Sequence, residues 1–238
     1  MNFWQNKCVI VTGGTSGLGR SLVLKLIEAG AKVAFCGRSK DKMEEVLNEI
    51  NPDLMDNIYN DIFEITEEDK IITFVQSAAN KFGTIDVLIN CAGANTARAL
   101  VEEIKIEDMD WMLKVNMMAP LMFIKEAYKY MKEKKEGLVV NILSTCCLFS
   151  NEGIAAYTAS KGALDSLTKV FRKEARKNNV RVCSVYPGGI NTAFRAQARE
   201  EYLSAESSAE TILRSLDIDK NVALDEIVLR PFVESNYC

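Results

Sequence analysis

The feature that most constrains the fold is a glycine-rich turn that joins a short apolar run to an amphipathic helical pattern. The apolar run is Cys8–Thr12, and Gly13 and Gly14 follow it directly. Apolar residues then recur at positions 18, 22, 26 and 27, which is the spacing of one helix face. A second apolar run, Lys32–Cys36, comes after Gly30. The pattern predicts a strand, a helix and a second strand parallel to the first.

The same alternation continues along the chain. Further strands are expected at Ile58–Tyr59, Asp86–Asn90, Leu138–Leu143, Val180–Tyr186 and Glu226–Leu229. Further helices are expected at Lys42–Ile50, from Thr66 onward, at Glu107–Lys134 (bent near Pro120) and at Ala156–Asn178. Repeated alternation with short connections predicts an α/β fold: a single Rossmann-like, doubly wound parallel sheet of about seven strands with helices on both faces. The 238 residues suit one such domain, which we expect to span 1–238.

Composition excludes several classes of function. The chain has no histidine, which rules out a Ser-His catalytic pair and metal sites built on His ligands. Seven cysteines without a Cys-x-x-Cys pair argue against a disulfide scaffold or a zinc site and favour a reducing, cytoplasmic location. A net charge of -4 provides no basic surface for nucleic acid. The longest apolar stretch, Trp111–Ile124, is interrupted by polar residues and is shorter than the ~20 apolar residues that span a membrane. We therefore expect no metal and no nucleic-acid or membrane partner.

The glycine-rich turn is suited to binding a dinucleotide. Glycine lets backbone amides approach a pyrophosphate closely, and the N-terminus of the following helix carries partial positive charge. A plain connecting turn is the alternative, but the position at the first strand–helix junction favours dinucleotide binding. The residues expected to contact the cofactor here are Gly13, Thr15, Ser16, Gly17, Leu18 and Gly19.

A tyrosine and a lysine four residues apart form the candidate pair for proton transfer. Tyr157 and Lys161 lie in a helical pattern, so both project from one face. A free phenol has a pKa near ~10, and a neighbouring ammonium lowers that pKa toward the range useful in acid–base catalysis. Such pairs also occur by chance on helices. Ser144, at the end of an expected strand, favours the catalytic interpretation, although it could also be a serine that only forms a turn.

Further motifs follow the glycine-rich turn in a fixed order. That turn reads Thr-Gly-x-x-x-Gly-x-Gly, and Asn90-Cys91-Ala92-Gly93 ends a later strand. The remaining motifs are Val115-Asn116-Met117, Asn141-Ile142-Leu143-Ser144, Tyr157-Thr158-Ala159-Ser160-Lys161 and Pro187-Gly188-Gly189-Ile190-Asn191-Thr192. From about Lys7 to Pro231 the chain resembles the short-chain dehydrogenase/reductase family. The resemblance implies an enzyme that transfers a hydride between a nicotinamide cofactor and a carbonyl or alcohol substrate.

The resemblance also implies roles for individual residues. Tyr157 would exchange a proton with a substrate oxygen that Ser144 holds, and Lys161 would also bond the nicotinamide ribose. Asn116 would hold a water against Lys161 through a distorted helix backbone, or else be a polar residue facing a subunit interface. Further cofactor contacts are implied for Asn90, Ala92, Gly93, Pro187, Gly188, Ile190 and Thr192, and for Glu64 and Ile65 beside the adenine, with Asp61 as a second candidate for the acidic position.

The residues after the second strand favour NADP over NAD. Family members that use NAD tend to carry Asp where this chain has Gly37. Arg38 follows, and its guanidinium can fork onto a 2′-phosphate while Ser39 adds a hydrogen bond. A solvated arginine at a helix start is the alternative. Ser16 stands where NADP users often carry a basic residue, so NAD stays open as the cofactor.

The substrate and the assembly are less constrained. Residues 193–210 are expected to form a short, charged lid over a small ketone, aldehyde, 3-oxoacyl or hydroxy-acid-like substrate. The apolar helices around Trp111–Ile124 and Ala156–Phe171 favour a homodimer or homotetramer. Cys91, where the family has a second Asn, is expected to loosen strand packing without abolishing catalysis. Cys146 and Cys147 are interpreted as buried spacers, with a place at the substrate mouth as the alternative.

Two other functions stay open at this point. A non-catalytic NAD(P)-binding redox sensor would share the fold, although such proteins usually lose the Tyr or the Lys. An epimerase or dehydratase could use the same Tyr and Lys, but those relatives tend to have longer C-terminal substrate domains.

Overall fold

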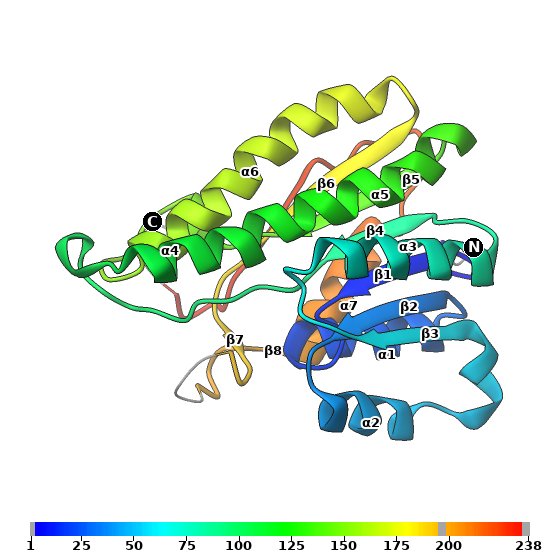
Figure 1. Cartoon of the computed structure of the whole chain (residues 1–238), viewed down its shortest axis with the longest axis horizontal. Coiled ribbons are helices and arrows are strands. Elements are labelled where there is room, and N and C mark those ends of the chain that lie inside the picture. The colour runs from blue at the N-terminus through cyan, green and yellow to red at the C-terminus, as the bar shows by residue number, and fades with distance from the viewer. Residues whose placement is uncertain (1–2, 195–198, 235–238) are drawn as a thin grey trace.

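Seven parallel strands form the central sheet of the computed structural model, which describes residues 3–194 and 199–234 (Figure 1). The strands are β1 (Cys8–Thr12), β2 (Lys32–Gly37), β3 (Ile58–Ile62), β4 (Val87–Asn90), β5 (Gly137–Ile142), β6 (Val180–Pro187) and β9 (Glu226–Leu229). They lie in the order β3-β2-β1-β4-β5-β6-β9, and every neighbouring pair is parallel. The predicted doubly wound α/β sheet is confirmed.

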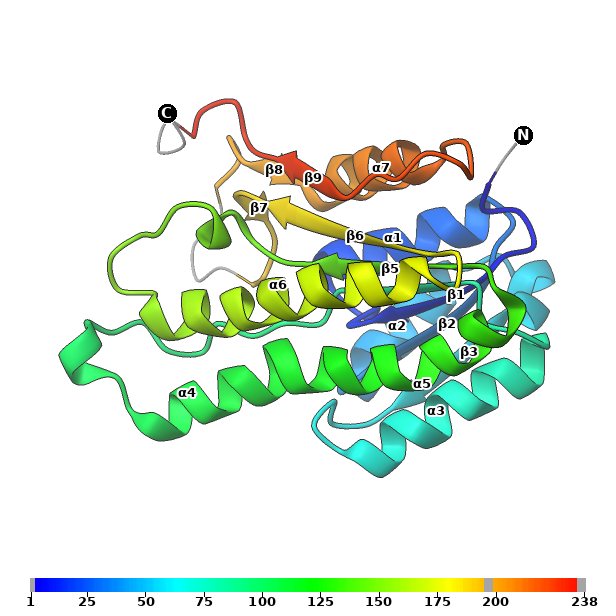
Figure 2. The same ribbon diagram turned by 90° about the horizontal axis from the view of Figure 1, so that it is seen from above.

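Helices cover both faces of this sheet (Figure 2). They are α1 (Gly17–Glu28), α2 (Lys40–Glu49), α3 (Glu68–Phe82), α4 (Ile106–Leu113), α5 (Ala119–Lys134), α6 (Ala155–Arg176) and α7 (Ala205–Leu216). Val9 and Val11 pack into a core with residues of α1, α2 and α7, whereas Ile10 packs into a core with residues of α3, α5 and α6. Because strand side chains alternate between the two faces, a strand buried on both sides must be apolar throughout. This is why β1 was visible in the sequence as an unbroken apolar run.

The long helix expected over residues 107–134 is divided in two. A π-helical turn, Lys114–Met118, separates α4 from α5. Pro120 follows at the start of α5 and has no backbone N–H to continue the regular helix ladder. The irregularity expected near Asn116 and Pro120 is therefore a π-helical turn that includes Asn116.

Helix α3 begins at Glu68, two residues later than expected. The Glu64 N–H donates to Glu67 Oε1 over 3.2 Å, and the Glu67 N–H donates to the Glu64 carbonyl over 2.9 Å. These two bonds close a turn over residues 64–67. The turn takes the place of the first helical residues expected from Thr66.

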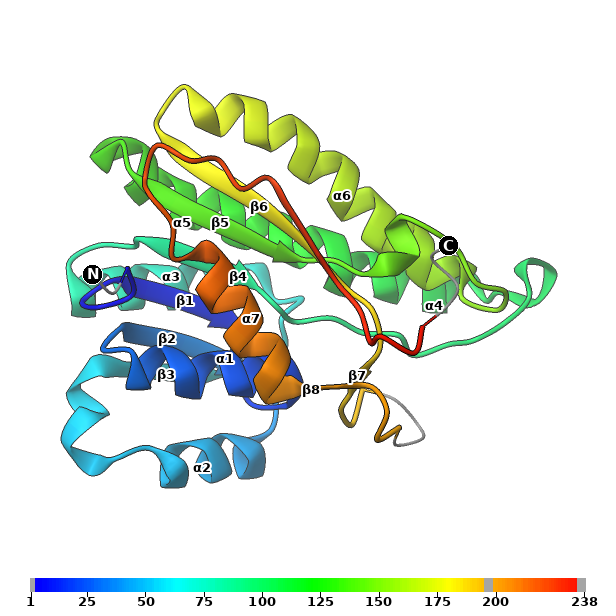
Figure 3. The ribbon, with the colours of Figure 1, turned by 180° about the vertical axis from the view of Figure 1, so that it is seen from behind.

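Helix α7 was not predicted from the sequence. The Ser204 hydroxyl caps it by accepting the Ser207 N–H over 3.0 Å, and Ile212 and Leu213 are buried on its inner face. Figure 3 shows α7 lying beside α1. Residues 205–210 of the expected lid therefore belong to a helix packed on the sheet, while residues 195–198 of it lie outside the described residues. A two-stranded sheet of β7 (Ile190–Asn191) and β8 (Leu203–Ser204) comes just before α7.

The chain order reverses between β1 and β4, which are neighbours in the sheet although β2 and β3 come between them in the sequence. In open α/β sheets a crevice forms at this point, outside the carboxyl ends of the strands. The glycine-rich turn follows β1, and the Asn90–Gly93 motif follows β4. Within the part of the chain that the structure describes, no helix is long and apolar enough to cross a membrane.

Candidate active site

The glycine-rich turn contacts two of the other predicted cofactor segments. Gly13 has φ +68°, and a Cβ there would lie 2.9 Å from Ala92 Cα. Gly17 has φ +51°, and a Cβ there would lie 3.3 Å from the Thr192 side chain. Positive φ favours glycine, and the close approaches leave little room for any side chain. The structure thus brings residues after β1, β4 and β6 together at the carboxyl ends of the strands.

Gly19 provides a test of how tightly this turn is packed. A Cβ at Gly19 would overlap the Gly13 carbonyl oxygen, whereas a Cβ at Gly162 in α6 would meet nothing within 4 Å. We expect Gly19→Ala to lower the free energy of unfolding by about 1–3 kcal/mol, the usual effect of overpacking. Gly162→Ala should raise it by about 0.5–1 kcal/mol. Denaturant unfolding of both variants measures this, and equal stability of Gly19→Ala and the wild type would contradict it.

The end of β2 places Arg38 beside the glycine-rich turn. A Cβ on Gly37 would overlap the Thr15 side chain, so an Asp cannot stand at position 37 without moving Thr15. Arg38 is exposed and, within the described residues, makes no hydrogen bond or ion pair with the protein. The Ser39 hydroxyl caps α2 by accepting the Lys42 N–H over 3.4 Å. The Arg38 guanidinium is therefore free to bind a ligand group.

The residues expected beside the adenine follow β3, the neighbour of β2. Glu64 is exposed and Ile65 is half-buried. Asp61, the second candidate, lies within β3, and its Oδ1 accepts the Ile62 N–H over 2.8 Å. Glu64 and Ile65 come after the carboxyl end of the strand, on the side where the crevice opens. An adenine contact of Glu64 and Ile65 stays a prediction.

Lys161 is a buried ammonium with few partners. Its side chain is on α6, the residue is only 3 % exposed, and Nζ donates to the Ile142 carbonyl over 2.8 Å. No carboxylate of the described residues forms an ion pair with it. Burial lowers the pKa of Lys161 below its ordinary value. A buried charge with a shifted pKa and no carboxylate partner is typical of a functional site.

Asn116 and Gly93 lie against this lysine. A Cβ on Gly93 would be 3.3 Å from both Lys161 Nζ and Asn116 Oδ1. The Asn116 side chain is fully buried: Oδ1 accepts the Ala94 N–H, and Nδ2 donates to the Ala94 carbonyl, each over 2.8 Å. Nδ2 also donates to Ser160 Oγ over 2.9 Å. Asn116 therefore joins the loop after β4 to α6 inside the chain, and the alternative of a residue facing a subunit interface is wrong.

Asn90 begins a separate buried chain of hydrogen bonds. Its Nδ2 donates to Asn141 Oδ1 over 2.8 Å, and Asn141 Nδ2 donates to Thr168 Oγ1 over 2.8 Å. The chain connects the ends of β4 and β5 to α6. These three residues fix the strand that precedes Ser144 against the helix that carries Lys161.

Ser144 and Tyr157 approach the same region from β5 and α6. The Ser144 hydroxyl accepts the Cys146 N–H over 3.2 Å and so begins a short 3-10 turn, Thr145–Cys147. Cys146 packs in an apolar cluster with Tyr157. The Tyr157 ring, almost buried, has its centroid 6.2 Å from that of Phe194. The turn that Ser144 caps therefore lies against the candidate proton donor.

The cysteines near the site differ in their environments. Burial raises the pKa of the Cys91 thiol to about 12, although the Lys161 charge opposes the shift. The Cys91 and Ala92 N–H groups both donate to Thr12 Oγ1 over 3.0 Å, which holds the loop without a second asparagine. Cys146 is buried and Cys147 is half-buried. The hydrogen bond with Cys147 lowers the pKa of the Cys146 thiol to about 6. Within the described residues no cluster of His, Cys, Asp or Glu could hold a metal ion.

Two contacts at the Pro187–Thr192 segment were missed in the sequence. The Gly189 N–H donates to Glu234 Oε1 over 2.9 Å, and a Cβ on Gly189 would overlap the Tyr202 ring. Glu234 lies beyond β9 and Tyr202 just before β8. No local pattern could indicate them, because the contacts join segments far apart in the sequence.

Comparison with known proteins identifies the family. The sequence profile that describes the short chain dehydrogenases matches residues 7–203. An uncharacterized oxidoreductase of Staphylococcus aureus strain MRSA252 is 32% identical over 234 residues, which cover 97% of this chain and 100% of the relative. An uncharacterized oxidoreductase of Staphylococcus saprophyticus is 30% identical over 231 residues, or 95% of this chain and 98% of that protein. The chain belongs to the short-chain dehydrogenase family.

Solved structures support the fold. An alcohol dehydrogenase from the archaeon Thermococcus sibiricus, complexed with 5-hydroxy-NADP, superposes with a TM-score of 0.86 at 23% identity, covering 96% of this chain and 97% of that one. The closed form of serine dehydrogenase complexed with NADP+ has a TM-score of 0.86 at 22% identity, covering 96% of each chain. By its family, the protein is an oxidoreductase that uses a nicotinamide cofactor and acts on CH–OH or C=O groups of small molecules.

Proposed function

We propose that the protein transfers a hydride between NADP(H) and a small carbonyl or alcohol substrate, with Tyr157 as the general acid and base. The observation that carries this proposal is the buried Lys161 ammonium, which has a backbone carbonyl but no carboxylate as its partner among the described residues. Burial of an isolated charge costs free energy. A catalytic role of the Lys161 ammonium explains why the folded chain keeps it buried. The Lys161 side chain is on the same helix face as Tyr157.

The glycine-rich turn fits a dinucleotide. A Cβ would collide with its neighbours at Gly13 and at Gly19, so the surface of the turn there is formed by backbone atoms. Helix α1 begins within this turn, at Gly17. Ser16 and Leu18 would offer backbone N–H groups to the pyrophosphate. Thr192 reaches the same turn, as its contact with Gly17 requires. When bound, the nicotinamide supplies or accepts the hydride.

The protein's own part of the reaction is the movement of one proton. For reduction, Tyr157 would donate its hydroxyl proton to the carbonyl oxygen, which Ser144 Oγ–H would hold by a hydrogen bond. The Lys161 ammonium would stabilise the resulting phenolate. Oxidation of an alcohol is the reverse, with Tyr157 taking up the proton. The Asn116 backbone, released from regular helix bonding in the π-helical turn, would hold a water that returns a proton from solvent.

The surroundings of Tyr157 favour a small and largely apolar substrate. Met112 and Ile154 are in its cluster, and Phe194 faces its ring. This agrees with a small ketone or aldehyde better than with a highly charged compound. Phe194 lies in the segment 193–210 expected as a lid, of which only the part before α7, up to Ser204, stays proposed as a lid, within a single domain 1–238. We also propose a homodimer or homotetramer, in which exposed apolar side chains such as Met118 and Val170 would be covered.

The proposal is tested by following NADPH oxidation in the presence of small ketones and aldehydes, with NADPH binding measured in parallel. Consumption of NADPH that depends on the carbonyl compound is the expected result. Binding without turnover across the panel would contradict the proposal and favour the redox sensor.

Arg38 is proposed to bind the 2′-phosphate and so to make NADP the preferred cofactor. Replacement by Ala should raise the KM for NADPH about 10–100-fold, because a hydrogen bond to a charged group contributes about 1.5–3 kcal/mol. The KM for NADH should stay the same. Arg176→Ala is the matched control, because Arg176 is an exposed arginine at the C-terminal end of α6. An unchanged NADPH KM in Arg38→Ala would show that the phosphate is bound elsewhere.

A further inference from the structure

Tyr186 occupies a central position behind the candidate site. It is fully buried near the end of β6, directly before the Pro187–Thr192 segment. Its ring forms a small apolar cluster with Leu143 and Leu164, against which Met117 and Cys147 pack.

The members of this cluster are next to the site residues in the chain. Leu143 precedes Ser144, and Met117 follows Asn116. Leu164 is one helical turn beyond Lys161. Tyr186 therefore touches the backbone neighbours of the proposed catalytic residues without itself being one of them.

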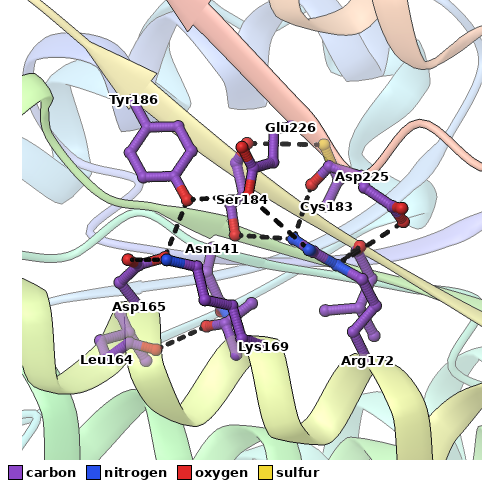
Figure 4. A network of polar contacts seen from close by, with 12 residues as sticks. Asn141, Leu164, Asp165, Lys169, Arg172, Cys183, Ser184, Tyr186, Asp225 and Glu226 are labelled. Carbon is purple, nitrogen blue, oxygen red and sulfur yellow. Dashed lines mark hydrogen bonds and ion pairs between the residues drawn. The ribbon is translucent and has the colours of Figure 1, made fainter. Parts of the chain in front are cut away.

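The Tyr186 hydroxyl is anchored to α6. It donates to Asp165 Oδ1 over 2.8 Å, and Asp165 is buried one turn beyond Lys161. Asp165 Oδ2 accepts from Lys169 Nζ over 2.7 Å, and Glu226 Oε1 lies 3.4 Å from the same hydroxyl. Figure 4 shows these side chains in one network between α6 and the strands β6 and β9. Burial and the bond to Asp165 raise the pKa of Tyr186, so the hydroxyl stays a proton donor in this bond.

The outer part of the network holds the same two elements together. Arg172 Nη2, from α6, donates to Ser184 Oγ over 3.0 Å and to the Asp225 carbonyl over 2.7 Å. Arg172 also lies 3.6 Å from the Asp225 carboxylate and 3.8 Å from that of Glu226. These contacts are farther from the site than Asp165, which is the member of the network that reaches the turn next to Lys161.

We propose that Tyr186 and Asp165 form a positioning pair that sets the distance between the proton-transfer residues of α6 and the segment that holds the nicotinamide. The proposal rests on the function proposed above. Packing alone does not require the bond, since a phenylalanine would fill the same apolar space. Hydride transfer needs reacting atoms about 3–3.5 Å apart, and a displacement of ~1 Å can lower the rate ~100-fold. The hydrogen bond from Tyr186 to Asp165 joins β6 to α6 and so restricts such a displacement. Asp165 is one helical turn from Lys161, and Tyr186 directly precedes Pro187.

The test compares two tyrosines. Tyr186→Phe removes the hydroxyl that binds Asp165, and Tyr128→Phe removes a hydroxyl that accepts from Asn178 Nδ2 over 2.7 Å, outside the site. Both variants lose one hydroxyl and its hydrogen bonding, which for Tyr186 includes the longer contact with Glu226, and both should lower the melting temperature. Only Tyr186→Phe should lower kcat, by about 10–100-fold. With deuterium at the transferred position of NADPH it should also show a larger isotope effect on kcat. Equal kcat values for the two variants would overturn the proposal.

Substitutions at Asp165 separate positioning from general stability. Asp165→Asn keeps an oxygen that can accept from Tyr186 and should restore kcat to within a few-fold of the wild type, whereas Asp165→Leu should match Tyr186→Phe. The double variant Tyr186→Phe/Asp165→Leu should be no slower than either single one, because both remove the same bond. Independent, multiplying losses would overturn the pair. A wild type that turns over no carbonyl compound would refute the proposed function, whereas turnover unaffected by Tyr186→Phe would refute only the pair.

Discussion

Replacement of Tyr157 by phenylalanine should lower the turnover of a carbonyl substrate about 100- to 10,000-fold, the usual contribution of a positioned general acid. Phenylalanine keeps the ring that packs with Met112 and Ile154 and faces Phe194, so the fold should persist. NADPH affinity should change little, since Lys161 and the glycine-rich turn stay intact. Steady-state kinetics and a fluorescence titration of NADPH measure the two quantities separately.

Tyr128→Phe is again the matched control, because its hydroxyl is bound to Asn178 outside the site. It should leave kcat unchanged. If Tyr157→Phe retained wild-type kcat, the proton would come from another group and the assigned role of Tyr157 would be wrong.

Replacement of Lys161 by methionine should have opposite effects on activity and stability. Turnover should fall at least as far as in Tyr157→Phe, because the phenolate and the nicotinamide ribose would both lose the ammonium. The free energy of unfolding at pH 7 should rise by about 1–3 kcal/mol, because methionine fills the space of the lysine stem without a buried charge. Denaturant unfolding and steady-state kinetics on the same preparation measure both effects.

The pH dependence of stability gives a second check on Lys161. Its pKa in the folded protein is lowered from the ordinary 10.5, mainly by burial. Between the lowered pKa and 10.5 the unfolded chain binds more protons than the folded chain, so the contribution of Lys161 to stability increases as pH rises through this window. Lys161→Met should lack that increase.

Lys173→Met is the control for both effects, since Lys173 is exposed on the same helix. It should change neither the turnover nor the pH dependence of unfolding. A Lys161→Met variant that is less stable than the wild type at pH 7 would show that the ammonium is compensated in the folded chain.

Much of the fold could be predicted because the central strands of the sheet are buried on both faces. The strand β1 has to be apolar throughout, and glycine is needed in the turn after it, because a Cβ at Gly19 would overlap the Gly13 carbonyl oxygen. Helix α7 has the same helical spacing, at Ala209, Ile212, Leu213 and Leu216, and a serine cap at Ser204. It was missed because its charged flanks were interpreted as part of the lid. Only residues 205–210 of this helix fall in the segment expected as a lid.

The sequence predicts which residues belong to the candidate site, but not how their side chains contact one another in the folded chain. The spacing of Tyr157 and Lys161 on one helix indicates a shared face, because the helix itself fixes that geometry. The approach of Gly93 and Asn116 to Lys161 depends on how three elements pack, which no local pattern contains. The same holds for the bond between Asp165 and Tyr186. The substrate depends on the lid, where residues 195–198 lie outside the described structure.

The central claim is tested most directly by following the fate of the transferred hydrogen. NADPH with deuterium at one face of nicotinamide C4 would be incubated with the wild type and a small ketone, and the alcohol product analysed by mass spectrometry. We expect one deuterium at the former carbonyl carbon from one C4 face only, and almost no labelled product with Tyr157→Phe. Binding of NADPH without labelled alcohol from any ketone or aldehyde tested, or labelled alcohol formed equally fast by Tyr157→Phe, would contradict the claim.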